Sequence, residues 1–241
     1  MLAIEEYESL RRIPSGRLVM YQRWRSLLFL HFSCDPQEVQ RLLPKGLDVD
    51  TFDGKAWVGL VPFRMEGIRP RFLPGVPGNT AFPETNVRTY VHKDGKEPGV
   101  WFFSLDADNP LACRVARTLW RLPYHEASMA LTEEPETRRY TCKRRQGNHE
   151  SLIEVQLGEE LKSALPGSLD FFLIERYLLY ADRAGFLLKG RVHHPPYPLQ
   201  AATVSKVDDS LVAAAGIEPR PIEHVLYSPG VDVRIYAIEP A

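Results

Sequence analysis

The residues best suited to chemistry lie between Glu84 and Tyr90, where polar side chains alternate with threonine and valine. Side chains two positions apart on a strand point the same way, so Glu84, Asn86, Arg88 and Tyr90 would share one face. Arginine presents a fixed fork of donors to a carboxylate, and glutamate serves as acid, base or orienting partner. The pattern fits one wall of a polar pocket. Alternation alone, however, favours a second interpretation, in which this face of the strand is solvated.

Other candidate site residues lie in three further segments. Asp106 closes an apolar segment, while Arg176 and Tyr180 would share a face of another strand. Ion pairs within the protein explain such groups as well as catalysis does. Tyr124 and His125 follow an arginine-rich helix, and histidine titrates near neutral pH, so both are candidates for proton transfer. The alternative for His125 is a packed side chain with a satisfied hydrogen bond.

Metal and disulfide chemistry have little support in the sequence. His193 and His194 are adjacent, so on a strand they point to opposite faces and would not easily bind one metal ion. The three cysteines, Cys34, Cys113 and Cys142, are far apart and form no Cys-x-x-Cys motif, which favours reduced structural thiols. We therefore expect no metal site and no organic cofactor.

Composition and missing motifs exclude several classes of protein. With 30 basic and 31 acidic residues in 241, the net charge of -1 argues against a nucleic-acid partner. No apolar run approaches the roughly 20 residues needed to cross a bilayer, so we expect a cytoplasmic protein without a membrane segment. Phosphate-binding loops, the Gly-x-Ser-x-Gly elbow, His-Glu-x-x-His and the dinucleotide fingerprint are absent. The length fits one domain, residues 1–241, with residues 1–19 as an amino-terminal extension.

Twenty prolines and sixteen glycines divide the chain into short segments, most with the alternation of strands. This predicts an α+β fold that is mainly antiparallel β with a few short helices. Helices are expected after Asp35-Pro36 and Asn109-Pro110, from Ser168, and near Leu211, where capping residues or apolar spacing occur. Strands are expected at 24–32, 47–52, 56–65, 85–92, 99–105, 126–131, 138–144, 151–157, 176–180, 186–193, 203–207, 225–227 and 231–238.

Two connections have clear signals of their own. Asp53-Gly54 predicts a tight type I′ turn that pairs strand 47–52 with strand 56–65. Residues 67–83 are rich in proline and glycine, which predicts a long loop without regular structure, of the kind that often covers a site.

Several strings together resemble the YqjF-like family of uncharacterised bacterial proteins. They are WRSLLFLH at 24–31, LPKGL at 43–47, FDGKAWVG at 52–59, FPETNVRTYV at 82–91, GVWFFSLD at 99–106, VHHPPYPL at 192–199 and SPGVDV at 228–233. The resemblance implies an acetoacetate decarboxylase-like fold, in which antiparallel sheets form a cone-shaped barrel around an interior pocket. In such a fold an inward-facing Arg88 without a partner would be costly, so a pocket becomes the better interpretation of the polar strand face.

The same resemblance separates this chain from the decarboxylase itself. That enzyme forms a Schiff base through a lysine in a Tyr-Pro-Lys-Lys string, and the corresponding segment here, 122–126, reads Leu-Pro-Tyr-His-Glu. The missing lysine argues against Schiff-base decarboxylation.

The sequence therefore leads to a hypothesis with two alternatives. The leading one is an enzyme, or former enzyme, that binds a small carboxylate or carbonyl compound, without a cofactor, through lyase- or hydrolase-like chemistry. The alternatives are a non-catalytic ligand-binding or sensing module and a structural protein with an internal ion-pair network; self-association into a homo-oligomer fits any of them. The candidate catalytic residues are Glu84, Tyr124 and His125, and the candidate binding residues are Arg88, Asn86, Tyr90, Asp106, Arg176 and Tyr180.

Overall fold

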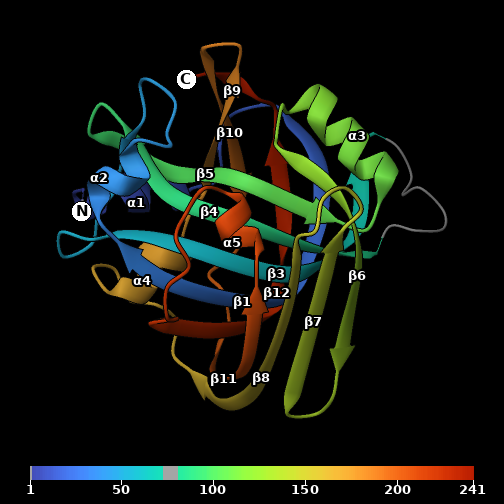
Figure 1. Cartoon of the computed structure of the whole chain (residues 1–241). Coiled ribbons are helices and arrows are strands. Elements are labelled where there is room, and N and C mark those ends of the chain that lie inside the picture. Colours follow the sequence, from blue (N-terminus) through green and yellow to red (C-terminus); the bar gives the residue numbers. More distant parts are fainter. Residues whose placement is uncertain (1, 73–80) are drawn as a thin grey trace.

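A computed structural model describes residues 2–72 and 81–241, in which most residues belong to strands (Figure 1). The helices of this part are α1 (Ile4–Arg11), α2 (Pro36–Gln40), α3 (Pro110–Leu119), α4 (Leu169–Ile174) and α5 (Leu211–Ala214). Its strands are β1 (Leu18–Cys34), β2 (Asp48–Val49), β3 (Ala56–Pro70), β4 (Phe82–Lys93), β5 (Lys96–Ala107), β6 (Tyr124–Glu133), β7 (Thr137–Arg144), β8 (Glu150–Leu161), β9 (Leu178–Arg183), β10 (Phe186–His193), β11 (Leu199–Asp209), β12 (His224–Tyr236) and β13 (Glu239–Pro240).

The strands form one large sheet whose pairing closes on itself. From β5 the order runs through β6, β7, β8, β11, β12, β1 and β3 to β4, and β4 pairs back with β5. All pairs are antiparallel except those of β5 with β6 and with β9, which are parallel. The predicted α+β, mainly antiparallel fold is confirmed, and the two parallel pairs make the sheet mixed. Figure 1 shows β4 and β5 crossing the middle of the molecule, with α3 near one end of them.

Local capping interactions explain why the predicted helices form where they do. The side chain of Asp35 accepts a hydrogen bond from the backbone N–H of Gln37, and Pro36 opens α2. The Asn109 side chain caps α3 in the same way, and Ser168 caps α4. Each cap satisfies a backbone donor that the first turn of a helix leaves without an intrahelical partner.

The turn at Asp53-Gly54 is confirmed, but the strand pairing expected around it is wrong. Both residues have positive φ angles, as a type I′ turn requires, and Phe52 and Lys55 exchange two backbone hydrogen bonds. Beyond that bridge β2 pairs with β4, whereas β3 pairs with β1 and β4. A turn fixes only the residues beside it, and the sheet provides longer partners for β3.

Other expected boundaries also change. Strand β3 continues to Pro70 and β4 begins at Phe82, so the predicted loop 67–83 is shorter than expected; residues 73–80 lie outside the described residues. The separate strands expected at 225–227 and 231–238 are one strand, β12. Helix α1 was not anticipated; its Tyr7 and Leu10 are buried.

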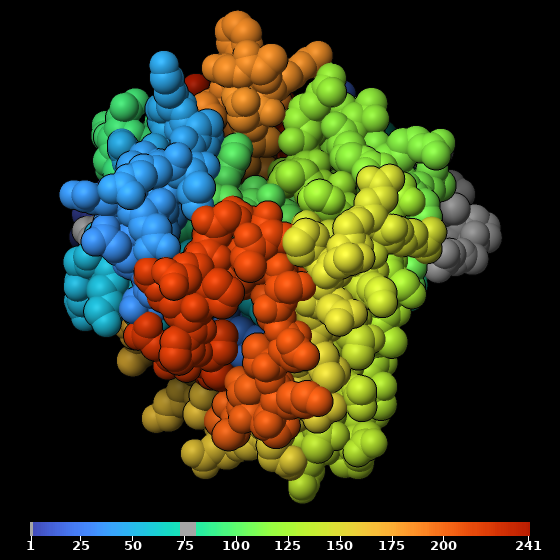
Figure 2. Space-filling view, in the orientation of Figure 1, coloured from blue at the N-terminus to red at the C-terminus, as the bar shows by residue number. Residues whose placement is uncertain are grey.

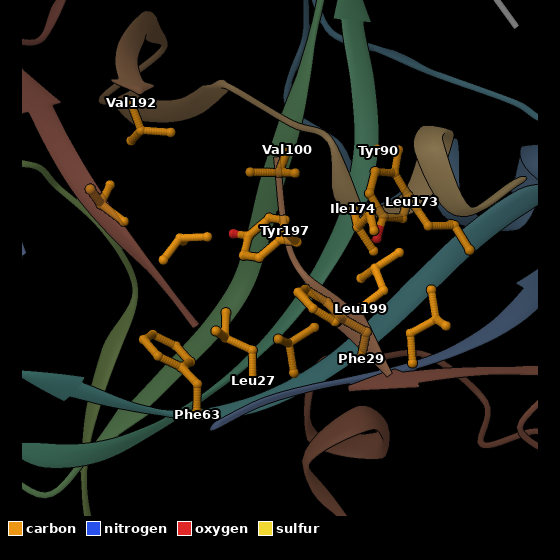
Figure 3. Close-up of a cluster of buried hydrophobic side chains, with 14 of the residues drawn as sticks. Leu27, Phe29, Phe63, Tyr90, Val100, Leu173, Ile174, Val192, Tyr197 and Leu199 are labelled. Carbon is orange, nitrogen blue, oxygen red and sulfur yellow. The ribbon is translucent and has the colours of Figure 1, made fainter. Parts of the chain in front are cut away.

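The buried side chains cover both faces of the central strands. On β1, Leu27 and Phe29 belong to one hydrophobic cluster, while Leu28 and Leu30 belong to another. Figure 3 shows part of the first cluster, in which Leu27, Phe29 and Tyr197 lie close together. The second cluster is covered by α5 and the chain that follows it, seen in orange-red over the middle of the face in Figure 2. Strands buried on both faces explain the nearly continuous apolar stretch in β1.

Helix α3 has large apolar side chains that are exposed. Leu111, Val115 and Leu119 recur at helical spacing, and all three are exposed. Cys113 is instead the buried residue of this helix. The apolar side chains of α3 line a cavity beside the helix instead of packing into the core.

Candidate functional site

A cavity of about 530 Å³ lies between β4 and the strands and helix around it. Its walls come from β1, β3, β4, β5 and α3, with single residues from β6, β9, β10 and β12. Most lining side chains are apolar. The polar ones are Gln22, Glu84, Asn86, Arg88, Asn109, Tyr124 and Tyr197. Glu84 and Arg88 are the only acidic or basic residues among the described residues that line it.

Strand β4 presents Glu84, Asn86 and Arg88 to the cavity, as the two-residue period predicts. Exposure decides between the two interpretations of this face: Glu84 is 2% exposed, Asn86 5% and Arg88 9%. A solvated face is therefore wrong. β4 lies inside the sheet, with β3 paired to one edge and β5 to the other.

A glycine opposite Arg88 makes room for its side chain. Gly59 pairs with Arg88 across β3 and β4. A Cβ atom at Gly59 would lie 3.0 Å from His31 Cδ2 and 3.4 Å from Arg88 Cγ. The absence of a side chain at Gly59 lets the imidazole and the arginine stem pass close to the backbone without a tight contact.

Buried Glu84 and half-buried Tyr124 form a hydrogen-bonded pair at the cavity wall. The Tyr124 hydroxyl donates to Glu84 Oε2 at 2.9 Å. Burial raises the pKa of Glu84 to about 8, with a contribution from the Asp106 carboxylate, although the hydrogen bond from Tyr124 opposes the shift. Burial, and then Glu84, raise the pKa of Tyr124 well above its ordinary value. At neutral pH, Glu84 is therefore mostly a neutral acid that can donate a proton.

Arg88 and Asn86 present polar atoms that the described protein does not satisfy. Arg88 Nη2 donates to the Leu173 carbonyl at 3.1 Å and to the Tyr90 hydroxyl at 3.4 Å, and the guanidinium lies 5.6 Å from the Phe29 ring centre. Arg88 Nε and Asn86 Oδ1 are buried without a hydrogen-bond partner among the described residues. Unpaired buried polar atoms are unusual and costly.

A chain of hydrogen bonds leads from Arg88 to the protein surface. Tyr90 Oη lies 2.7 Å from His31 Nε2, and His31 Nδ1 lies 3.1 Å from His224 Nδ1. His224 Nε2 in turn lies 2.8 Å from the carboxylate of Asp170, whose side chain is 42% exposed. Burial, followed by the charges of His224 and Arg88, lowers the pKa of His31. His31 is therefore mostly neutral where it lies behind Arg88.

Two of the predicted binding residues are committed to ion pairs elsewhere. Asp106 accepts two hydrogen bonds from Arg144, at 2.6 and 2.9 Å, and both side chains are buried. Arg176 Nη1 donates to Asp50 Oδ2 at 2.9 Å. Neither Asp106 nor Arg176 lines the cavity. The ion-pair interpretation accounts for the contacts of both.

The remaining predicted residues also lie away from the cavity. The Tyr180 hydroxyl donates to the Glu97 carbonyl, and Tyr90 stands behind Arg88. His125 is exposed on the side of β6 opposite Tyr124, and burial of part of its ring, with Arg144 nearby, lowers its pKa. His194 is buried, with its ring centre 4.6 Å from that of Tyr197, while His193 is partly exposed.

Sequence reasoning missed three contributors to the site. Tyr197 lines the cavity from the chain between β10 and β11, and Figure 3 shows it between Val100 and Leu27. His31 supports Arg88 from within β1, and α3 contributes its apolar side. A lone histidine inside an apolar strand segment was the signal for His31, whereas the position of Tyr197 depends on distant packing.

Comparison with known proteins then decides the family. A family model, DUF2071, described as an uncharacterized conserved protein, matches residues 21–232. The chain belongs to the DUF2071 family. It is also 38% identical over 216 residues to the uncharacterized protein YqjF of Bacillus subtilis (strain 168), which covers 88% of this chain and 89% of that protein. The resemblance seen in the sequence is confirmed.

Solved structures show the fold that this DUF2071 protein shares. The enduracididine biosynthesis enzyme MppR, complexed with pyruvate, is similar with a TM-score of 0.66 and 11% identity, covering 93% of this chain and 90% of its own. An acetoacetate decarboxylase-like enzyme from Sphingomonas wittichii RW1 is similar with a TM-score of 0.65 and 13% identity, covering 95% and 94%. The fold is therefore acetoacetate decarboxylase-like.

This DUF2071 chain differs from a Schiff-base enzyme in the side chains at its cavity. No lysine is among the described residues that line it, and residues 73–80 contain none in the sequence. Within the described ranges, no group of three or more histidine, cysteine, aspartate or glutamate side chains could hold a metal ion. No helix in these ranges is long and apolar enough to span a membrane.

Proposed function

We propose that this protein binds a small carboxylate or carbonyl compound in the cavity beside β4, with Arg88 holding the anionic end. The proposal rests on one observation, which is whether each buried arginine has an acidic partner. Arg144 and Arg176 each pair with a buried carboxylate, whereas Arg88 has no acidic partner among the described residues. A buried charge is costly without one. A ligand carboxylate would supply it.

The charge of the cavity supports a ligand with one negative charge. At neutral pH Glu84 is mostly protonated, so Arg88 provides the only full charge among the lining side chains described above. Asn86 would bind a polar group of the ligand next to the one held by Arg88. The structurally similar enzyme MppR forms a complex with pyruvate, a compound of this class.

The chemistry that these residues support needs no Schiff base. Glu84, aligned by Tyr124, would donate its proton to a carbonyl oxygen of the ligand and become a carboxylate, as a general acid with a raised pKa does. Such a step fits a cofactor-independent lyase- or hydrolase-like enzyme. His125 lies outside the cavity, and we leave it out of this set. The alternative proposal is a binding or sensing module that uses the same cavity without turnover.

Binding is tested with pyruvate and acetoacetate by calorimetry and thermal shift on the purified protein. We expect Arg88→Ala to weaken binding roughly thirtyfold or more, because it removes the charged partner of a buried anion. Asn86→Leu keeps the volume and should weaken binding roughly tenfold. Thr85→Val makes a similarly small change on the opposite face of β4 and should leave binding intact. If Arg88→Ala binds as tightly as the parent, the assignment of Arg88 is wrong.

Turnover separates the enzyme from the binding module. The same compounds are incubated with protein and followed by proton NMR, in parallel with the Glu84→Gln variant. An enzyme consumes the ligand, or exchanges its protons with solvent, and loses this activity in Glu84→Gln. A binding module returns the ligand unchanged while still binding it saturably.

A further inference from the structure

The exposed apolar residues of α3 mark the opening of the cavity. Leu111, Val115 and Leu119 lie four residues apart, so they form one stripe along the helix. They are 66, 40 and 64% exposed, and all three line the cavity. Side chains that face solvent and cavity together form a rim. The cavity therefore opens beside α3 with an apolar edge.

The basic group of the cavity, Arg88, lies away from that rim. Glu84 contacts Tyr124 at the α3 end, and Arg88, four residues further along β4, contacts the Leu173 carbonyl and the ring of Phe29. Four residues of strand span about 13 Å. The cavity therefore has a cationic end at Arg88 and an apolar mouth at α3.

The walls that β1 and β3 form between these two ends are mostly apolar. Strand β1 contributes Trp24 and Leu27, and β3 contributes Val61, Phe63 and Met65. A compound as small as pyruvate would leave most of the 530 Å³ as water against these side chains. Cavities of this size usually enclose larger ligands with mainly apolar contacts.

We propose that the ligand is an amphipathic monocarboxylate, whose carboxylate binds at Arg88 and whose apolar body, an acyl chain or aromatic ring system, extends to the rim formed by α3. This inference rests on the proposed function and adds the substrate class. The neutral state of Glu84 supports it, because an ionised carboxylate at the α3 end would be costly beside an apolar chain.

Affinity for straight-chain carboxylates tests the inference. Butyrate, hexanoate and octanoate are titrated into the full-length protein, with calorimetry or the fluorescence of Trp24 and Trp120, which line the cavity, as the readout. Each buried methylene should tighten binding about fourfold, so octanoate should bind roughly two-hundred-fold tighter than butyrate. 1-Octanol, which lacks the carboxylate, should bind much more weakly than octanoate.

Variants of the rim locate the apolar end of the ligand. Leu119→Gln changes an exposed side chain and should weaken octanoate binding several-fold while leaving butyrate unchanged. Leu165→Gln is the matched control, since Leu165 is 72% exposed and does not line the cavity. Equal octanoate affinity in the Leu119→Gln variant and the parent would overturn the placement of the chain.

The outcomes separate this inference from the proposed function. Arg88-dependent binding of pyruvate or butyrate, with no gain in affinity for longer chains, would overturn the amphipathic ligand and leave the carboxylate site in place. If no carboxylate of any length binds, the proposed function fails and the inference fails with it. An affinity that rises with chain length in the parent and is lost in Arg88→Ala supports the proposed function and the amphipathic ligand together.

Discussion

Replacing Glu84 with glutamine should change how stability depends on pH. In the unfolded chain this carboxyl loses its proton near its ordinary pKa of 4.5, whereas in the folded protein it keeps the proton up to about pH 8. Between these values the folded state binds one more proton than the unfolded state. Raising the pH therefore favours unfolding through this window, and Glu84 destabilises the protein at pH 8 and above.

The size of the effect follows from the two pKa values. Each pKa unit corresponds to about 1.4 kcal/mol, so the free energy of unfolding should fall by about 5 kcal/mol between pH 4.5 and pH 8 because of Glu84 alone. Glutamine has the same shape, can still accept the hydrogen bond from Tyr124 and does not titrate. Glu84→Gln should therefore match the parent near pH 4.5 and exceed its stability by several kcal/mol at pH 8.5.

Urea unfolding at half-unit steps from pH 4.5 to pH 9, followed by tryptophan fluorescence, measures this difference. Contributions of the other titrating groups cancel between parent and variant. Glu159→Gln makes the same substitution on the exposed part of β8 and should run parallel to the parent. If the Glu84→Gln curve also runs parallel, Glu84 titrates normally, and its assignment as a neutral acid is incorrect.

Three further substitutions test the buried polar groups, each by urea unfolding, and a fourth at exposed Asp232 is a control. Asp106→Asn should lower the free energy of unfolding by about 3–5 kcal/mol, because it leaves Arg144 charged and buried. Asp232→Asn breaks the ion pair with Arg25, in which the Asp232 side chain is 75% exposed, and should lower it by less than about 1 kcal/mol. His194 has its pKa lowered by burial to about 4, so the parent should lose about 3 kcal/mol as the pH falls from 6.5 to 4, and His194→Asn should remove that loss. Tyr90→Phe should cost about 1–3 kcal/mol at pH 7, because a buried imidazole nitrogen loses its partner; unchanged stability would show that this hydrogen bond contributes nothing.

Local interactions explain which parts of the fold could be predicted from the sequence. The caps at Asp35, Asn109 and Ser168 each join a side chain to a backbone N–H two or three residues away. The turn at Asp53-Gly54 likewise depends on residues that accept positive φ angles. These features need no knowledge of the rest of the chain.

Pairing over long distances could not be predicted in the same way. Strand β5 pairs in parallel with β6 and β9, and β2 pairs with β4, because the whole sheet closes in that order. The stripe on α3 shows the same limit: helical spacing groups its apolar residues on one side but does not say that a cavity, instead of packed side chains, lies opposite.

The candidate site, like the fold, could be predicted only where local sequence decides the arrangement. The two-residue period places Glu84, Asn86 and Arg88 together, since that grouping is a property of one strand. It does not show which partner each charged group finds. Asp106 pairs with Arg144, which lies 38 residues away, and Arg176 pairs with Asp50, which lies 126 residues away. Such partners become visible only when the sheet is assembled.

The protonation of Glu84 connects the stability of the protein with its proposed function. Glu84 lines the same cavity as Arg88 and would be its nearest acidic counterpart there, yet it hydrogen-bonds to Tyr124 and stays neutral near pH 7. Arg88 then keeps its full charge for a ligand. Above pH 8, ionised Glu84 would cancel that charge, so binding of an anion that requires the neutral acid should weaken up to tenfold per pH unit. Glu84→Gln should bind such an anion with the same affinity at pH 7 and pH 9, and a pH dependence that persists in this variant would assign the titration to another group.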